Sequence, residues 1–446
     1  MSIMNPAYTV YNLLGRFLFL GLFPGFRIYS SLSNRKNESM RQRFGLYPGN
    51  LVSQVSGSPR IWIHAASVGE VTVASAITDA LMGLIPDCAI ISSTTTRHGQ
   101  TYLRAKHLPQ TTCVYAPIDF PPTVYRSLKT FKPDILVCLE TEIWPNWLIT
   151  ASKMRIKTAI VNGRISIRSI EKYLKIRPII KEALVHIHGF SMIAETDALR
   201  IKTLGAPEDR IVVNGNAKYD LLLAQADMSQ KDIIQSKFCI REGEPVFIAG
   251  STRGSEEEIV LGAYQKILQV IPKTVLILAP RHISRIPQIE TLIKKKGFEY
   301  QLKTDLDHKD ARRTAPVVII DTMGDLQTIY SVATVVFCGG SLVPLGGHNV
   351  LEPAVWGKPV LYGTSMEDFL DAKALLEKTG GGIQIKDGSD LADKVIYYLS
   401  HPALSQKTGH LARKALMANV GAAKKHALFI CQLLSPSIRK FDKVWN

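Results

Sequence analysis

The sequence lacks paired cysteines, spaced metal ligands and internal repeats, and it is short of acidic residues. Its six cysteines form no C-x-x-C pair and mostly fall in or next to apolar runs, which indicates neither a zinc site nor a disulfide framework and favours a reducing compartment. The histidines show no ligand spacing, so we do not expect metal catalysis. No repeat, coiled coil or low-complexity tract is present, and we expect ordinary globular domains.

The charge balance is strongly basic. Lys and Arg number 54 and Asp and Glu 38, for a net charge of +16 over 446 residues. Such an excess indicates a polyanionic partner, which charge alone leaves open among nucleic acid, an anionic membrane surface and phosphorylated substrates. The basic residues form no continuous stripe with interleaved aromatic residues, so we expect no nucleic-acid partner.

Only one long hydrophobic run is present, at Tyr8–Phe26. It is interrupted by Arg16 and closed by Pro24 and Gly25, so it is marginal as a membrane span. No positive region precedes it, and we expect it to remain on the protein rather than to be removed as a signal peptide. The basic cluster that follows it consists of Arg27, Arg35, Lys36, Arg41 and Arg43. Basic residues there favour anionic headgroups and a cytoplasmic orientation.

We therefore expect residues 1–49 to attach the protein to a membrane, either spanning it or lying in its interface. Because residues 1–26 precede the first expected strand, we also expect the protein to fold without them. The alternative is a buried N-terminal core helix, which would place Leu13, Phe17 and Leu20 against the first domain.

From Arg60 onward, short apolar runs alternate with helical stretches, a pattern typical of parallel α/β sheets. The first set of expected strands is 61–63, 89–92, 112–115, 135–139, 158–161, 191–194 and 211–213. The second set is 246–249, 275–279, 317–320, 335–338, 359–361 and 382–385. Two Rossmann-like domains follow, at 50–215 and 216–401. Residues 216–244 begin the second as a polar connection, and 402–446 form a helical tail.

The stretch 336–363 predicts a strand, a glycine loop, a helix and a strand. Four glycines, Gly339, Gly340, Gly346 and Gly347, lie within nine residues. With a helix opened by Asn349, the loop predicts an anion cradle, and Glu352 suits a ribose hydroxyl. A structural alternative is that Asn349 and Glu352 form only a variant capping box.

Charged residues follow several expected strands, where ligands of open α/β sheets bind. Carboxylates at Glu70, Glu140 and Glu142 follow strands of the first domain, Arg281 follows a strand of the second, and Lys218 lies at the domain junction. Each has a structural alternative, as a helix-end charge or a surface ion pair. Together they predict a cleft between the domains with an acidic centre and basic rims.

Eight motifs resemble one known family, the 3-deoxy-D-manno-oct-2-ulosonic acid (Kdo) transferases of lipopolysaccharide assembly. They are WIHAASVGE (62–70), ETEIWPNW (140–147), NGRIS (162–166), GNAKYD (215–220), AGST (249–252), PRH (280–282), DTMGDL (321–326) and GGSLVPLGGHNVLEPAVWGKPVL (339–361). The resemblance covers almost the entire chain. Two departures are Gly163, where Ala is common, and Asp325, where Glu is usual.

The resemblance implies the GT-B fold, two Rossmann-like domains facing across a cleft, and an inverting, metal-independent transfer without a cofactor. Glu70 matches the family's base, and Glu140 and Lys218 match positions that stabilise the transition state. The matching CMP-binding residues are Pro280, Arg281, Met323, Gly324, Asp325, Asn349, Val350, Leu351 and Glu352. Arg281 would supply charge to the phosphate and Glu352 a ribose contact.

The implied partners are CMP-Kdo as donor, the lipid A precursor as acceptor and anionic lipids at the cytoplasmic face of the inner membrane. Two alternatives remain open. One is another GT-B enzyme, such as a nucleotide-sugar epimerase or a UDP-sugar transferase, and the other is a non-catalytic protein that binds anionic lipid. The number and linkage of Kdo residues, the oligomeric state and the role of the basic stretch Lys153–Lys181 also stay open.

Overall fold

The computed structural model describes residues 6–31, 37–105, 111–308 and 311–435, and the chain divides into two compact units. Unit 1 runs to Leu221 and resumes at Val420, whereas unit 2 comprises Leu222–Asn419. The first boundary lies six residues beyond the predicted one at 215. The predicted tail is divided, because α19 (Pro402–Met417) belongs to unit 2 and α20 (Ala422–Leu434) to unit 1.

Unit 1 is built on a parallel seven-stranded sheet in the order β3-β2-β1-β4-β5-β6-β7. The strands are β1 (Arg60–His64), β2 (Ala89–Thr94), β3 (Thr111–Tyr115), β4 (Ile135–Leu139), β5 (Lys157–Gly163), β6 (Gly189–Met192) and β7 (Ile211–Val213). All seven predicted strands are present, although β6 begins two residues earlier than predicted.

The core of unit 1 lies on both faces of this sheet. Along β1, Trp62 packs into one buried cluster with Phe131 and Trp147, whereas Ile61 and Ile63 pack into a second cluster. Because successive strand residues point to opposite faces, a strand covered on both sides needs a continuous apolar run, which is the pattern that the sequence shows.

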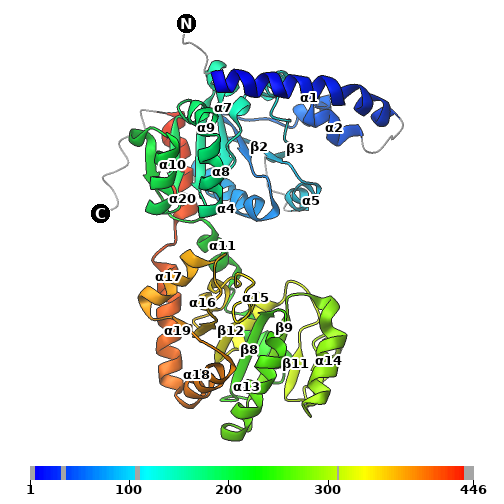
Figure 1. The fold of residues 1–446 in the computed structure, drawn as a ribbon, viewed down its shortest axis with the longest axis vertical. Helices are drawn as coiled ribbons and strands as arrows, with labels where there is room; N and C mark the ends of the chain where they lie inside the picture. The colour runs from blue at the N-terminus through cyan, green and yellow to red at the C-terminus, as the bar shows by residue number, and fades with distance from the viewer. Residues whose placement is uncertain (1–5, 32–36, 106–110, 309–310, 436–446) are drawn as a thin grey trace. The chain divides into compact units, whose positions relative to one another are not determined.

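Helices cover both faces of the unit 1 sheet (Figure 1). They are α1 (Pro6–Ser31), α2 (Asn37–Arg43), α3 (Gly49–Val52), α4 (Val68–Leu84), α5 (Arg97–Ala105), α6 (Pro121–Phe131), α7 (Pro145–Lys153), α8 (Ile167–Lys175), α9 (Arg177–Leu184), α10 (Glu195–Leu204) and the 3-10 turn η1 (Glu208–Arg210). Helix α20, from the far end of the chain, packs against α4. The expected connection at 216–244 holds two helices, α11 (Lys218–Gln225) and α12 (Gln230–Lys237).

Unit 2 repeats the plan with the strand order β10-β11-β9-β8-β12-β13-β14, again all parallel. The strands are β8 (Val246–Thr252), β9 (Val275–Pro280), β10 (Tyr300–Leu302), β11 (Val317–Ile319), β12 (Val335–Cys338), β13 (Val360–Tyr362) and β14 (Gly382–Gln384). Six of these were predicted. Strand β10 was missed because it is an edge strand of three half-buried residues with Gln301 at its centre, which gives no apolar run.

The helices of unit 2 flank this sheet on both faces (Figure 1). Besides α12 and α19, they are α13 (Glu256–Val270), α14 (Ile286–Lys295), α15 (Leu326–Ile329), α16 (Leu351–Val355), α17 (Leu370–Thr379), α18 (Gly388–Ser400) and the 3-10 turns η2 (Ile283–Arg285), η3 (Asp305–Asp307) and η4 (Tyr330–Val332). Two α/β units of this kind confirm the predicted α/β class with two Rossmann-like domains.

The start of α1 is docked on unit 1. Tyr8 is buried and its hydroxyl donates to Asn146 Oδ1 (2.7 Å), while the Tyr11 hydroxyl donates to Asp119 Oδ2 (2.7 Å). Residues 1–26 contribute no strand, as expected, but these contacts make the first turns of α1 part of the domain and count against the expectation that the protein folds without them. The core-helix alternative also fails in detail, because Leu13 and Phe17 are exposed.

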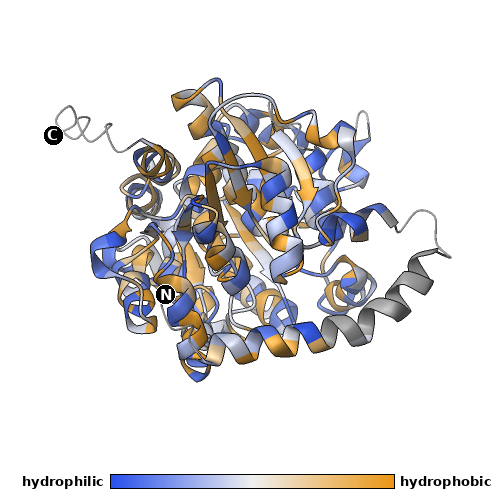
Figure 2. Ribbon diagram, turned by 90° about the horizontal axis from the view of Figure 1, so that it is seen from above, coloured by the Kyte–Doolittle hydropathy of each residue, from blue (hydrophilic) through white to orange (hydrophobic). Residues whose placement is uncertain are grey.

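In Figure 2, the coloured part of the α1 ribbon mixes hydrophobic and hydrophilic residues, whereas the sheet strands are mostly hydrophobic. Among the helices of the described residues, none combines the length and the apolar character that crossing a bilayer requires. Of the predicted basic flank, Arg35 and Lys36 lie outside the described residues, as does the end of the predicted tail at 436–446.

Candidate functional site

Glu70 lies in the first turn of α4, directly after β1. Its carboxylate accepts hydrogen bonds from the backbone N–H of Ala66 (2.8 Å) and from the Ser67 hydroxyl (2.9 Å), while Ser67 Oγ accepts from the N–H of Glu70 (3.3 Å). This is a capping box, so the structural alternative for Glu70 is present. Burial raises the pKa of Glu70, and the charges of Glu142 and Glu140 add to the effect against the hydrogen bonds, which lower it.

Glu140 and Lys218 form an ion pair at the carboxyl edge of the same sheet, with Lys218 Nζ 2.8 Å from Glu140 Oε1. Glu140 directly follows β4 and has a φ of 50°, a left-handed conformation that residues other than glycine rarely adopt. Such strain persists only where surrounding contacts fix it, and it is concentrated at functional sites. Glu140 also acts electrostatically on Glu70, so it links the two other predicted catalytic residues: Glu70 through charge and Lys218 through the ion pair.

The loop that carries Lys218 is held by residues far away in the sequence. Asn162 Oδ1 accepts the N–H of Ala217 (2.9 Å). The Asp220 carboxylate accepts the N–H groups of Gly421 (2.5 Å) and Ala423 (2.7 Å), which cap the start of α20. These bonds tie the start of α20 to the segment that carries Lys218.

A second polar group lies beside this site. His64 is fully buried, with Nε2 3.6 Å from Glu142 Oε2 and Nδ1 3.0 Å from Ser93 Oγ. Trp144 Nε1 donates to Glu142 Oε2 (2.6 Å). Burial alone would raise the pKa of Glu142, but the contacts with His64 and Trp144 lower it. Glu142 is therefore the stronger acid of two neighbouring carboxyl groups and Glu70 the weaker.

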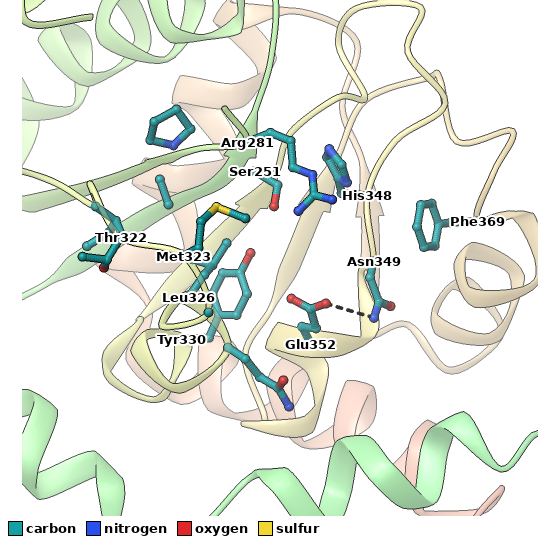
Figure 3. Close-up of a pocket in the computed structure, with 15 residues that line it drawn as sticks. Ser251, Arg281, Thr322, Met323, Leu326, Tyr330, His348, Asn349, Glu352 and Phe369 are labelled. Atoms are coloured by element: carbon teal, nitrogen blue, oxygen red, sulfur yellow. Dashed lines mark hydrogen bonds between the residues drawn. The ribbon is translucent and has the colours of Figure 1, made fainter. Parts of the chain in front are cut away.

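Unit 2 contains a pocket of about 340 Å3 at the carboxyl ends of its strands. It is lined by Ser251, Ala279, Pro280, Arg281, Ile320, Thr322, Met323, Gly324, Leu326, Gln327, Tyr330, His348, Asn349, Glu352 and Phe369. Figure 3 shows the guanidinium of Arg281 directed toward His348 and Glu352, with Met323 and Tyr330 facing it. Six of the nine residues predicted to bind the nucleotide line this pocket, and they come from three separate segments.

The other three predicted residues do not line the pocket. Val350 and Leu351 are buried in the core. The Asp325 carboxylate accepts from Lys303 Nζ (2.9 Å) and from the Thr322 hydroxyl, so it fixes the loop that presents Met323. Asp325, where the family usually has Glu, therefore makes its contacts within the protein.

The glycine loop is not an empty anion cradle, which corrects our prediction. The N–H groups of Gly340 (2.6 Å), Ser341 (2.9 Å) and Leu342 (2.9 Å) donate to the buried carboxylate of Glu256 on α13. The cradle therefore holds an internal anion.

The later glycines of this loop serve packing. A Cβ at Gly346 would lie 2.5 Å from Asp368 Oδ2, and one at Gly347 would lie 2.4 Å from Met366 Sδ; both residues also have positive φ. The helix α16 begins at Leu351 rather than at Asn349 and has only five residues. Its dipole is too short to be the source of anion binding that we predicted.

The pKa values of Glu352 and His348 in the pocket differ from those of the free side chains. Burial raises the pKa of Glu352, although the hydrogen bond from Asn349 (3.2 Å) and the charge of Arg281 oppose this. Burial and the charges of Arg281 and Arg253 lower the pKa of His348 to about 4, so its imidazole is neutral at physiological pH. Within the described part of the chain, no three His, Cys, Asp or Glu side chains group closely enough to hold a metal ion.

Residues 38–221 match the family model described as 3-deoxy-D-manno-octulosonic-acid transferase (kdotransferase). The 3-deoxy-D-manno-octulosonic acid transferase of Aquifex aeolicus is 30% identical over 76% of this chain and 86% of its own length. The chain belongs to the Kdo transferase family. The corresponding transferase of Haemophilus influenzae is 29% identical and covers 93% of this chain and 94% of its own. The protein is a glycosyltransferase that transfers Kdo in lipopolysaccharide biosynthesis.

Among solved structures, the UDP-GlcNAc 2-epimerase from Neisseria meningitidis bound to UDP-GlcNAc resembles this Kdo transferase with a TM-score of 0.61 and 12% identity. The match covers 84% of this chain and 100% of the epimerase chain. At this identity the likeness shows the GT-B type of fold alone and carries no information about the reaction.

Nine residues that line the pocket of this Kdo transferase were not predicted as site residues: Ser251, Ala279, Ile320, Thr322, Leu326, Gln327, Tyr330, His348 and Phe369. Ser251 is at the end of β8, so the rule that ligands bind after strands would have found it. Tyr330 and Gln327 come from a helical segment with no distinguishing pattern, and only the fold brings them to the pocket.

Proposed function

We propose that this Kdo transferase moves Kdo from CMP-Kdo to the acylated, bisphosphorylated glucosamine disaccharide that is the lipid A precursor, with inversion at the anomeric carbon. The observation that carries the proposal is the convergence of Pro280-Arg281, Met323-Gly324 and Asn349 with Glu352 on one pocket. Arg281 suits a phosphate, the Glu352 carboxylate suits ribose hydroxyls, and the pocket volume of about 340 Å3 lies at the lower end of the usual range for small ligands.

Glu70 is assigned as the general base. It takes the proton from the acceptor hydroxyl, the acceptor oxygen bonds to the anomeric carbon of Kdo, and the bond from that carbon to the phosphate oxygen breaks, so that CMP leaves with the electron pair. Its raised pKa favours this role, because a base near the working pH transfers protons most effectively. The bonds from Ala66 and Ser67 orient the carboxylate.

Glu140 and Lys218 are assigned to the transition state. A carboxylate stabilises positive charge that develops on the sugar, and an ammonium stabilises negative charge on the departing phosphate. The ion pair of 2.8 Å keeps both groups fixed before substrate arrives. With Arg281 and Lys218 as the cations, we propose that the reaction requires no metal and no further cofactor.

The test is mass analysis of the product formed by purified protein, CMP-Kdo and lipid A precursor, in the presence of EDTA. Addition of one or more Kdo masses to the acceptor is the expected result. No added Kdo in a folded protein would overturn the assignment of substrates, and activity lost with EDTA and restored by Mg²⁺ would overturn the metal-independent mechanism.

We also propose that α1 lies in the plane of the cytoplasmic face of the inner membrane rather than across it. Its apolar side chains Val10, Leu13, Leu14 and Phe17 are exposed at the i, i+3, i+4, i+7 spacing of one helix face, with Leu14 58% and Phe17 72% exposed. Arg16 and Lys153 line a hollow beside the helix, and they suit anionic headgroups.

Replacing both Leu14 and Phe17 by Ser tests this attachment. We expect the double variant to cosediment less with phosphatidylglycerol vesicles, while transfer to acceptor in detergent micelles and the melting temperature stay as in wild type. Leu199→Ser is a matched control, since Leu199 is similarly exposed (65%) on α10. Unchanged cosedimentation, or a markedly lower melting temperature, would show that this face does not serve the membrane.

A further inference from the structure

Arg253 lies beside Arg281 at the carboxyl edge of the unit 2 sheet. Strands β8 and β9 pair in parallel, with Thr252 the register partner of Pro280, and the N–H of Arg281 donates to the carbonyl of Thr252 (3.0 Å). Each arginine is the residue after one of these two partners. They therefore leave adjacent strands at the same level, next to the pocket that Ser251, Pro280 and Arg281 line.

Neither arginine forms an ion pair with another described residue. In the same unit, by contrast, Arg285 pairs with Glu257 (2.8 Å) and Arg313 pairs with Glu244 (2.7 Å). Two cations side by side repel each other unless an anion lies between them. The contrast with their paired neighbours indicates that the anion for Arg253 and Arg281 comes from a ligand.

The backbone at Arg253 is fixed independently of any ligand. Its N–H donates to Glu256 Oε2 (2.9 Å), the same carboxylate that holds the glycine loop. A Cβ at the next residue, Gly254, would lie 3.7 Å from Val343, so this turn packs against the loop that leads to His348. The side chain of Arg253 thus starts from a rigid position at the rim of the pocket.

Both arginines act on the same pocket residue, because the charges of Arg281 and Arg253 each contribute to keeping His348 neutral. The acids that interact electrostatically with this group are Glu352, near Arg281, and Asp368, near His348. Burial raises the pKa of Glu352, which weakens its ability to neutralise Arg281. The group as a whole is suited to more than one negative charge on a ligand.

The donor that we propose above carries two negative charges close together. Kdo is an ulosonic acid, so its carboxylate and the phosphate oxygen of CMP-Kdo are attached to the same carbon. We propose that Arg281 binds the phosphate and that Arg253 binds the carboxylate of Kdo, which makes Arg253 a specificity-determining residue for acidic sugars. The guanidinium can bind a carboxylate through two parallel hydrogen bonds. This inference rests on the proposed function.

The test compares the KM for CMP-Kdo with the inhibition constant of CMP, which has the phosphate but no sugar carboxylate. In Arg253→Met, we expect the KM for CMP-Kdo to rise about 10- to 100-fold, the scale for a charge-assisted hydrogen bond. The inhibition constant of CMP should stay within about twofold of wild type, because its phosphate contact at Arg281 remains. Arg253→Lys should recover part of the loss, since the charge is kept and the fork is lost.

Two further variants serve as the positive and the negative control. Arg281→Met should weaken CMP-Kdo and CMP alike, and Arg312→Met, which removes an exposed arginine of the same unit, should change neither. Equal weakening of both ligands in Arg253→Met would assign Arg253 to the phosphate, and no weakening of either would remove it from the site; both outcomes overturn the inference. Wild-type protein that forms no Kdo product would instead overturn the proposed function, so the two failures are distinguishable.

Discussion

Glu70 in unit 1 and Glu256 in unit 2 occupy equivalent places in their units. Each follows the first strand of its sheet, β1 or β8, and lies in the first turn of the helix after it, α4 or α13. Each accepts a backbone N–H from the loop before the helix, of Ala66 in one unit and Arg253 in the other. The two carboxylates nevertheless have different surroundings.

Glu256 is fully buried and accepts four backbone N–H groups, from Arg253, Gly340, Ser341 and Leu342. Glu70 is partly exposed, accepts one N–H and one hydroxyl, and has two acidic neighbours that raise its pKa. The four donors occupy the oxygens of Glu256 within the protein, whereas Glu70 accepts only two hydrogen bonds and keeps lone pairs available for an acceptor hydroxyl. The number of donors therefore separates a structural carboxylate from a candidate base at the same position.

The largest effect that would sharpen this comparison is the loss of protein stability when Glu256 is replaced. In Glu256→Gln, the amide group faces backbone N–H donors and leaves at least one of them unpaired in the interior. We expect the free energy of unfolding of unit 2 to fall by about 3 kcal/mol, measured by denaturant or thermal unfolding. The same change at the exposed Glu258, two residues along α13, is a matched control and should have little effect.

If Glu256→Gln were as stable as wild type, the carboxylate would not hold the glycine loop. The loop would then be free to bind a ligand phosphate, as its sequence predicts. If the loop binds the phosphate, that variant should bind CMP more tightly than wild type. If Glu256 holds the loop in place, as we infer, the variant should bind CMP more weakly.

A smaller effect is expected on the pH dependence of transfer. Glu70 acts as a base only when it is deprotonated, so kcat/KM falls as the pH drops through its pKa, which burial and acidic neighbours raise above 4.5. Glu142→Gln removes one of the negative charges that raise it. We therefore expect the acidic limb of the kcat/KM profile to move to lower pH, and Glu171→Gln, an exposed change on α8, to leave it in place.

If the acidic limb of the kcat/KM profile moves to higher pH in Glu142→Gln, or does not move, Glu142 does not raise the pKa of the catalytic base. The group that titrates would then have to be a residue other than Glu70.

The strands were largely predictable because buried parallel strands need continuous apolar runs, and such runs stand out in the sequence. The same reasoning placed Glu70, Glu140 and Arg281 correctly at carboxyl ends of strands, since that edge follows from the order of strand and helix alone. Lys218 was also singled out from the sequence, although the segment that carries it is held in place by the bond between Asp220 and the start of the distant helix α20.

The glycine loop was misread for a physical reason. Glycines mark places where a backbone must approach something closely, but they do not say whether the neighbour is a ligand or the protein. Here the neighbours are Glu256, Asp368 and Met366, all from other segments. Docking of α1 through Tyr8 and Tyr11 was equally hidden, because two hydroxyls in an apolar run give no sign of their partners.

The most direct test of the account is the rate of Kdo transfer by Glu70→Gln at saturating CMP-Kdo and acceptor. Glutamine keeps the shape and the contacts with Ala66 and Ser67 but cannot accept the proton. We predict a rate about 100- to 10,000-fold below wild type, with unchanged CMP affinity and melting temperature, while the exposed Glu171→Gln transfers normally. Near wild-type transfer by Glu70→Gln would contradict the account, and Glu70 would then be a capping residue like the structural carboxylate of unit 2.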